Sequence, residues 1–192
     1  PKPSGHDLLV EVRAISVNPV DYKVRQRAEP EPGQYKVLGW DAAGIVKEVG
    51  DEVCEFKRGD TVFYAGDITR SGSNAEYQLV DERIVGRMPG NLSFAEAAAL
   101  PLTSITAWEL LFDRLQIPKK GEGKKSNILI VGAAGGVGSI MVQLLRTLTD
   151  VTIIGTASRK ESVEWLLELG AHHIIDHKKP LSEVLQTTGI KE

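Results

Sequence analysis

The chain has 192 residues, of which 42% are hydrophobic and 26% charged, with a formal net charge of −3 and a single cysteine. This composition is that of an ordinary water-soluble globular protein with one large domain or two small ones, and it offers no basic excess for a polyanionic partner. A single cysteine excludes an intramolecular disulfide framework and a multi-cysteine metal site, and it fits a reducing compartment.

The sequence predicts neither a membrane span nor an export leader. No apolar run approaches the roughly 20 residues that a helix needs to cross a bilayer, and no charged-then-apolar leader opens the chain. A cytoplasmic location is therefore the expectation. Because the chain starts at Pro1 without a methionine and stops at Glu192, we expect both ends to be cut edges of a longer protein.

The first half, from residue 8 to about residue 90, is predicted to be mostly β-strand. Short apolar runs alternate there with turn residues, in the segments "LLVEVRAI" (8–15), "AGIVKEVG" (43–50), "GDTVFYAG" (59–66) and "AEYQLV" (75–80). Helices follow. Ser93 and Glu96 form a capping box before an alanine-rich helix, which we expect Pro101 to end, and a second helix is predicted over 104–115.

The segment "PKKGEGKKS" (118–126) contains four lysines and two glycines, and we interpret it as a solvated connector between a domain at 1–117 and a domain at 118–192. Beyond it, a strand is followed by a helix three times, at 128–132 and 136–148, 151–156 and 160–169, and 173–175 and 181–188. This order predicts a doubly wound α/β domain. Three strands would leave an unpaired sheet edge, so we expect the domain to be incomplete.

A glycine-rich turn, "GAAGGVG" (132–138), joins the first of these strands to its helix. Gly132, Gly135 and Gly138 permit a tight turn and a close backbone approach to a diphosphate, whose charge would meet free N–H groups at the helix N-terminus. A flexible surface loop is the alternative, but the flanking strand and amphipathic helix disfavour it. The predicted cofactor-binding residues of the turn are Gly132, Ala134, Gly135, Gly136, Val137 and Gly138.

The segment "TASRKES" (156–162) lies about twenty positions past the turn, where this fold places an acidic residue for NAD or an arginine for NADP. The strand tip carries Ser158 and Arg159 and no carboxylate. A hydroxyl and a guanidinium can bind a 2′-phosphate, whereas a carboxylate would repel it, so the sequence predicts NADPH. The alternative, an N-cap serine and solvated charges opening the next helix, is compatible with that role for Ser158.

Seven segments together resemble one family, the medium-chain dehydrogenase/reductases, and within it the quinone oxidoreductase-like branch that includes proteins labelled zinc-type alcohol dehydrogenase-like. They occur in the family's order and approximate spacing, as "SVNPVDY" (16–22), "GWDAAGIVKEVG" (39–50), "KRGDTVF" (57–63), "AEYQLV" (75–80), "AAALPLTSITAWELL" (97–111), "GAAGGVG" (132–138) and "LGAHHIIDH" (169–177). The resemblance implies a mixed α/β chain: a β-rich GroES-like catalytic domain followed by a Rossmann domain, incomplete here, with the active site between them. It also implies a homodimer.

The family's zinc-dependent members hold a catalytic metal with cysteine, histidine and a carboxylate. The resemblance puts Asn18 at the cysteine position, Trp40 at the histidine position, and Val20 where a hydroxyl relays protons. An amide oxygen is a poor zinc ligand and an indole nitrogen only donates, so no zinc is expected. The remaining metal candidates are interpreted as polar residues at a strand start, because strand neighbours face opposite sides: His172, His173, Asp176 and His177.

Without a metal, the expected substrate is a quinone or an α,β-unsaturated carbonyl, whose oxygen takes up the charge of the hydride. The resemblance implies that Asn18 donates to this oxygen, that Tyr22 forms the pocket wall or donates a proton, and that Asp21 orients them. It places Thr106 against the nicotinamide. Each residue has an alternative: Asn18 as a turn residue, Asp21 as a helix cap and Tyr22 as half-buried core.

The resemblance leaves two details open. Related reductases often bind the 2′-phosphate with a lysine and then a tyrosine, where this chain has Ser162 and His177, and His177 is included among the predicted cofactor-binding residues. The family also includes non-catalytic members that act structurally or bind RNA. The sequence has no basic stripe with interleaved aromatics, so a small-molecule substrate is predicted and nucleic acid is not. A non-catalytic NADPH-binding protein and a zinc alcohol dehydrogenase are the rival interpretations.

Overall fold

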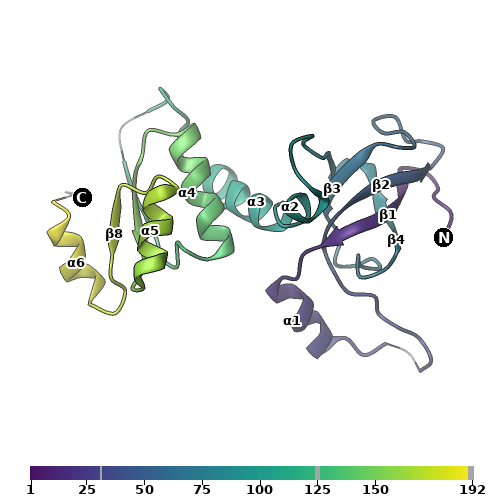
Figure 1. Cartoon of the computed structure of the whole chain (residues 1–192), viewed down its shortest axis with the longest axis horizontal. Helices are drawn as coiled ribbons and strands as arrows, with labels where there is room; N and C mark the ends of the chain where they lie inside the picture. The colour runs from purple at the N-terminus through teal and green to yellow at the C-terminus, as the bar shows by residue number, and fades with distance from the viewer. Residues whose placement is uncertain (31, 124–125, 190–192) are drawn as a thin grey trace. The chain divides into compact units, whose positions relative to one another are not determined.

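The computed structural model describes residues 1–30, 32–123 and 126–189, and it divides into two compact units, Pro1–Leu102 and Thr103–Glu192 (Figure 1). The first unit contains an antiparallel sheet and the second a parallel sheet. The predicted fold class, a mixed α/β chain with a β-rich part before a parallel α/β part, is confirmed.

The five strands of the first unit form one sheet in the order β4-β1-β2-β3-β5, with every neighbouring pair antiparallel. Their bounds are β1 (Asp7–Ile15), β2 (Asp41–Val49), β3 (Thr61–Ala65), β4 (Tyr77–Asp81) and β5 (Val85–Arg87), and the short helix η1 (Glu82–Ile84) joins the last two. One face buries the core residues Leu8, Val10, Ala42, Val46, Val62, Tyr64 and Val80. The four predicted strands are present, and the short β5 was not predicted.

Besides η1, the described residues of this unit form the α-helices α1 (Pro19–Arg27) and α2 (Phe94–Ala98). The capping box before α2 is confirmed: the Ser93 backbone N–H donates to Glu96 at 2.8 Å, and the Glu96 N–H donates to the Ser93 hydroxyl. The expectation for Pro101 is wrong, because α2 ends before it and Pro101 begins α3 (Pro101–Trp108). Proline is favoured at a first helical position, where its missing N–H would have no partner within the helix.

The second unit contains a parallel sheet in the order β6-β7-β8, flanked by helices. The elements are β6 (Asn127–Ile130), α4 (Gly136–Leu148), β7 (Thr152–Thr156), α5 (Lys160–Glu168), β8 (His173–Ile175) and α6 (Leu181–Thr187). All six lie within two residues of their predicted bounds. None of the helices in the described part of the chain combines the length and apolar character needed to cross a bilayer.

The division between the units falls ahead of the predicted boundary at 117/118. Ala107 of α3 and Leu111 of the π-helical segment η2 (Glu109–Arg114) are fully buried in the same core cluster as Met141 and Leu145 of α4. These helices, predicted to belong to the first domain, therefore pack as part of the second unit. Residues 124–125 of the predicted connector lie outside the described residues.

Candidate functional site

The glycine-rich turn is a closed loop between β6 and α4. Gly132 has φ +71°, in the left-handed region that favours glycine, and Gly135 is the N-cap residue of α4. The Gly135 N–H donates to the Gly132 carbonyl at 3.0 Å, and the Ser139 N–H donates to the Gly135 carbonyl at 2.8 Å. The loop thus leads the chain directly into the helix, whose first-turn N–H groups have no acceptor within the helix.

The glycines of this turn differ in the space around them. A Cβ on buried Gly138 would lie 2.4 Å from the Ala133 carbonyl oxygen and 2.6 Å from the Ala133 Cα. A Cβ on Gly135 would meet only the Gly132 oxygen at 3.3 Å, and one on Gly136 only the Thr103 methyl at 3.3 Å. Gly138 therefore allows α4 to pack closely against Ala133 of the turn, while the backbone at Gly135 and Gly136, before the helix N-terminus, is less crowded. This arrangement fits a diphosphate.

Thr156, at the end of β7, is a further residue of this loop that sequence reasoning missed. Its hydroxyl is almost fully buried and accepts the Gly132 backbone N–H at 2.9 Å. The bond ties the first glycine of the loop to the neighbouring strand. The only sequence signal is a threonine at the carboxyl end of a buried strand, which is too common to identify this contact. Ala134 and Val137 pack partly against the core.

The strand tip after β7 carries the predicted 2′-phosphate residues. Arg159, and not Ser158, is the N-cap residue of α5, and its side chain makes no capping bond, which corrects the alternative role considered for Ser158. The Ser158 hydroxyl lies 3.3 Å from His177 Nε2, so these two predicted residues come together. Arg159 forms no ion pair with any described residue, whereas Lys160 lies 3.8 Å from Glu164.

A hollow of about 430 Å³ opens at this tip, lined by Ala157, Ser158, Arg159, Lys160, Val163, Glu164, Ile174, Ile175 and Asp176. Its lining combines apolar side chains with a hydroxyl, two basic groups and two carboxylates. Thr106, the predicted nicotinamide contact, lies exposed on α3, one turn after the Thr103 that faces Gly136.

In the first unit, three polar side chains near the start of α1 are at least nine-tenths buried: Asn18, Asp21 and Asp41. The Asn18 backbone N–H donates to Asp21 Oδ2 at 2.8 Å, and the Asn18 side-chain amide donates to Asp41 Oδ2 at 2.9 Å. Asn18 is thus the N-cap residue of α1, and the Asp21 carboxylate accepts its backbone N–H, so the turn role of Asn18 and the capping role of Asp21 are both present. Tyr22, with 54% of its surface exposed, is not core.

Asp41, the first residue of β2, is the central member of this cluster and was not predicted as a site residue. It is fully buried, and its Oδ1 accepts the Leu102 backbone N–H at 3.1 Å. Burial raises the pKa of Asp41 to about 6, assisted by the nearby Asp21 and opposed by the hydrogen bonds from Asn18 and Leu102. An aspartate opening the apolar run "DAAGIV" was the available signal. Asp21 Oδ1 is also buried, and it accepts no hydrogen bond from the described residues.

The residues at the family's zinc-ligand positions do not fit a metal. Trp40 is buried, and its indole N–H donates to the Asp67 carbonyl at 3.1 Å, while the Asn18 amide nitrogen faces Asp41. His172, from the other metal candidates, accepts the Ile153 N–H at Nδ1 and contacts Arg146 at Nε2. Across the described ranges, no three His, Cys, Asp or Glu side chains are grouped to hold a metal ion.

Residues 4–108 match the alcohol dehydrogenase GroES-like domain family. Among curated relatives, a zinc-type alcohol dehydrogenase-like protein of Staphylococcus epidermidis is 46% identical over 192 residues, which are 100% of this chain and 56% of the relative. The 2-methylene-furan-3-one reductase of Solanum lycopersicum is 39% identical over 188 residues, 90% of this chain and 45% of the relative. The chain thus spans about half the length of these relatives.

Solved structures show similarity to the same family. A proposed zinc-dependent alcohol dehydrogenase from Rhizobium etli CFN 42 matches with a TM-score of 0.90 and 61% identity, over 98% of this chain and 55% of that one. Escherichia coli quinone oxidoreductase complexed with NADPH matches with a TM-score of 0.80 and 30% identity, over 98% and 56%. The chain, with a GroES-like match over more than half its length, belongs to the medium-chain dehydrogenase/reductase superfamily, in its quinone oxidoreductase-like branch.

Proposed function

We propose that the protein is a zinc-independent, NADPH-dependent oxidoreductase that transfers hydride to a quinone or an α,β-unsaturated carbonyl compound. The observation that carries this proposal is the replacement of the family's metal ligands by Asn18 and Trp40, whose nitrogens both donate hydrogen bonds within the protein. Without a Lewis acid, the substrate must itself delocalise the incoming electron pair. The names of two relatives, a quinone oxidoreductase and a furanone reductase, agree with this substrate class.

Bound NADPH would supply the hydride. In the proposed reaction, the Asn18 amide, held by Asp41 through one N–H, presents its second N–H to the substrate oxygen as negative charge develops there. The Asp21 carboxylate fixes the Asn18 backbone. The exposed Tyr22 hydroxyl can deliver the proton that completes the reduction. The chain's contribution is thus to orient the substrate and to stabilise the developing oxyanion.

The test is NADPH oxidation by the purified full-length protein with a panel of quinones and enones, before and after prolonged chelation. We expect turnover with at least one member of the panel, unchanged by the chelator, and no stoichiometric zinc by elemental analysis. Turnover that is lost on chelation and restored by zinc would establish the zinc alcohol dehydrogenase instead. NADPH binding without turnover of any substrate would favour a non-catalytic NADPH-binding protein.

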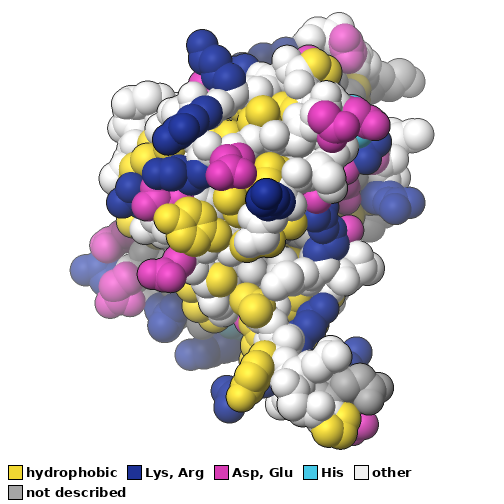
Figure 2. Space-filling model, turned by 90° about the vertical axis from the view of Figure 1, so that its right-hand side faces the viewer, with side chains coloured by type: hydrophobic (Ala, Val, Ile, Leu, Met, Phe, Trp, Pro, Cys, Tyr) yellow, Lys and Arg dark blue, Asp and Glu magenta, His cyan; other side chains and the backbone are white. Residues whose placement is uncertain are grey.

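A nucleic-acid partner is not proposed. On the face that Figure 2 shows, Lys and Arg side chains are interspersed with Asp and Glu. This face therefore lacks the continuous basic footprint that phosphate backbones require.

The cofactor preference is assigned to Arg159. Replacing Arg159 with alanine removes a charge-assisted hydrogen bond to the 2′-phosphate, about 1.5 to 3 kcal/mol, so NADPH should bind about ten- to a hundredfold more weakly while NADH binding is spared. Fluorescence titration of both cofactors measures this. Lys160→Ala, which removes a neighbouring cation already paired with Glu164, is the matched control and should change little. Equal losses for NADPH and NADH in Arg159→Ala would contradict the assignment.

A further inference from the structure

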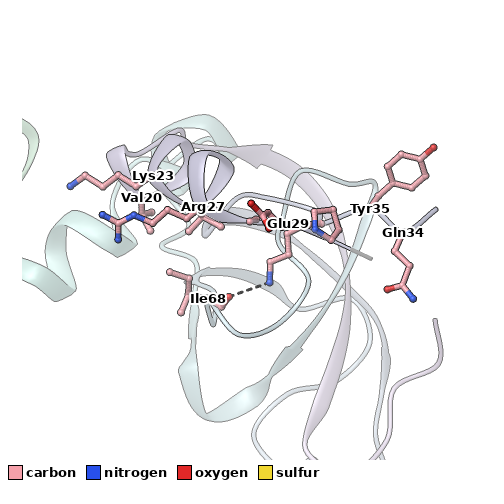
Figure 3. A pocket seen from close by; sticks show the side chains of 11 residues that line it. Val20, Lys23, Arg27, Glu29, Gln34, Tyr35 and Ile68 are labelled. Atoms are coloured by element: carbon pink, nitrogen blue, oxygen red, sulfur yellow. Dashed lines mark hydrogen bonds between the residues drawn. The ribbon is translucent and has the colours of Figure 1, made fainter. Parts of the chain in front are cut away.

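A hollow of about 630 Å³ lies along one face of α1. Val20 and Val24, one turn apart on the helix, line it with apolar side chains. Ile68 lies across from Val20 (Figure 3). Val20 belongs to the first turn of α1, directly after the start of the helix where Asn18 and Asp41 are hydrogen-bonded. The hollow therefore begins two residues along the chain from Asn18, although Asn18 itself does not line it.

The charged side chains around this hollow are mainly basic. Lys23 and Arg27 extend from α1 at an i, i+4 spacing (Figure 3). Lys36, from the segment after α1, also lines the hollow. Lys36 Nζ is hydrogen-bonded to the carbonyls of Ile68 and Arg70, each at 3.4 Å. Within the described part of the chain, Lys23 and Arg27 have no ion-pair partner, and Glu29 is the only carboxylate lining the hollow.

Two like charges one turn apart on a helix repel each other, and a bound anion would relieve that repulsion. The two cations are not equivalent. Arg27 lies in the last turn of α1. The partial negative charge of the helix C-terminus there weakens the positive potential that a bound anion would feel from the Arg27 guanidinium. Lys23 lies one turn earlier, about 8 Å along the helix axis from Asn18 at 1.5 Å per residue. Of the two cations, Lys23 lines the hollow closer to Val20 and the start of α1, so we take it as the better placed contact for an anionic group on the substrate.

We propose that this hollow selects substrates in which an apolar body joins the reducible carbonyl to an anionic group, a carboxylate or a phosphate, with Lys23 as the principal contact. The proposal rests on the proposed function and adds a substrate class to it. The apolar wall of Val20 and Val24 receives the body of the substrate, and the ammonium group receives its charge.

The experiment compares three enones that differ only at one ring position: para-carboxybenzalacetone, its methyl ester, and the analogue with a para phosphate ester. The full-length protein is assayed with saturating NADPH as wild type, as Lys23→Gln and as Arg25→Gln. Arg25 is the matched control, because it is an exposed cation on the same helix and does not line the hollow. Lys23→Gln should raise KM for the two anionic enones about three- to tenfold with kcat unchanged, and it should leave the ester unaffected.

Comparable effects of Lys23→Gln and Arg25→Gln, or equal effects on the anion and the ester, would overturn the proposal. Comparing KM for the carboxylate enone with KM for the phosphate-ester enone shows which anion the hollow prefers. Calorimetric titration of para-carboxybenzalacetone into the NADPH-bound protein gives a readout that needs no turnover. Weaker binding to Lys23→Gln without turnover in the wild type would retain the anion site and reject the proposed function. Equal binding to both proteins would reject the anion site.

Discussion

The Gly138→Ala variant is expected to lose about 3 kcal/mol of unfolding free energy and to bind no dinucleotide. Its Cβ would lie 2.4 Å from the Ala133 carbonyl oxygen and 2.6 Å from the Ala133 Cα. Both are backbone atoms and both residues are buried, so α4 would have to move away from Ala133 of the turn to make room. Overpacking of this kind costs about 1 to 3 kcal/mol, and rigid backbone neighbours put this site at the upper end.

Gly135→Ala separates cofactor binding from folding. Gly135 has φ −76°, which any residue adopts, and an added Cβ would meet only the Gly132 oxygen at 3.3 Å. The variant should therefore lose much less stability than Gly138→Ala, yet its methyl group would occupy the backbone position where the diphosphate is proposed to bind. Urea denaturation and NADPH titration of both variants test the pair. Wild-type NADPH affinity in Gly135→Ala would place the diphosphate elsewhere, and wild-type stability in Gly138→Ala would refute the packing argument.

Asp41→Asn is expected to lower turnover about ten- to a hundredfold while NADPH binding is retained. The two carboxylate oxygens of Asp41 accept from two different donors, the Asn18 amide and the Leu102 N–H. An amide offers only one oxygen, so the variant must face one of these donors with an NH₂ group. A buried donor without an acceptor costs about 1 to 3 kcal/mol, which corresponds to the stated loss if the Asn18 amide turns away from the substrate. Asn18→Ala should show a similar loss of kcat, and full activity in Asp41→Asn would remove Asp41 from the mechanism.

The same substitution should change how stability depends on pH. The pKa of Asp41 is raised from its ordinary 3.8 to about 6, so between these values the folded protein holds a proton that the unfolded chain has released. Stability from this group is therefore lost as pH rises from about 4 to 6, by about 3 kcal/mol for roughly two pKa units. Asp41→Asn lacks this loss, so its stability relative to the wild type should improve over that range.

Urea denaturation at several pH values between 4 and 7 measures the difference. Asp81→Asn is the control. Hydrogen bonds from Arg83 hold the pKa of Asp81 well below its usual range, so Asp81 changes stability only below about pH 4, and the curves of the wild type and Asp81→Asn should run parallel between pH 4 and 7. Parallel pH curves for the wild type and Asp41→Asn would show that Asp41 titrates normally.

The sequence alone determined the features that depend on near neighbours in the chain. The strand–turn–helix order of residues 127–188, the glycine turn and the Ser93–Glu96 capping box were all predicted within two residues, because periodicity, caps and turns are set by side chains a few positions apart. The absence of metal ligands at positions 18 and 40 was equally readable, since it depends only on which side chains stand there.

Only the tertiary structure decided the contacts that define the site. Asn18 meets Asp41 across 23 residues, Gly132 meets Thr156 across 24, and Ser158 meets His177 across 19. Likewise, α3 and η2 join the second unit because Ala107 and Leu111 pack on α4, which no local pattern reveals. These pairs depend on strand order and on which core a helix face covers. The burial that raises the pKa of Asp41 likewise exists only when β2 lies within its sheet and the Leu102 N–H reaches the carboxylate.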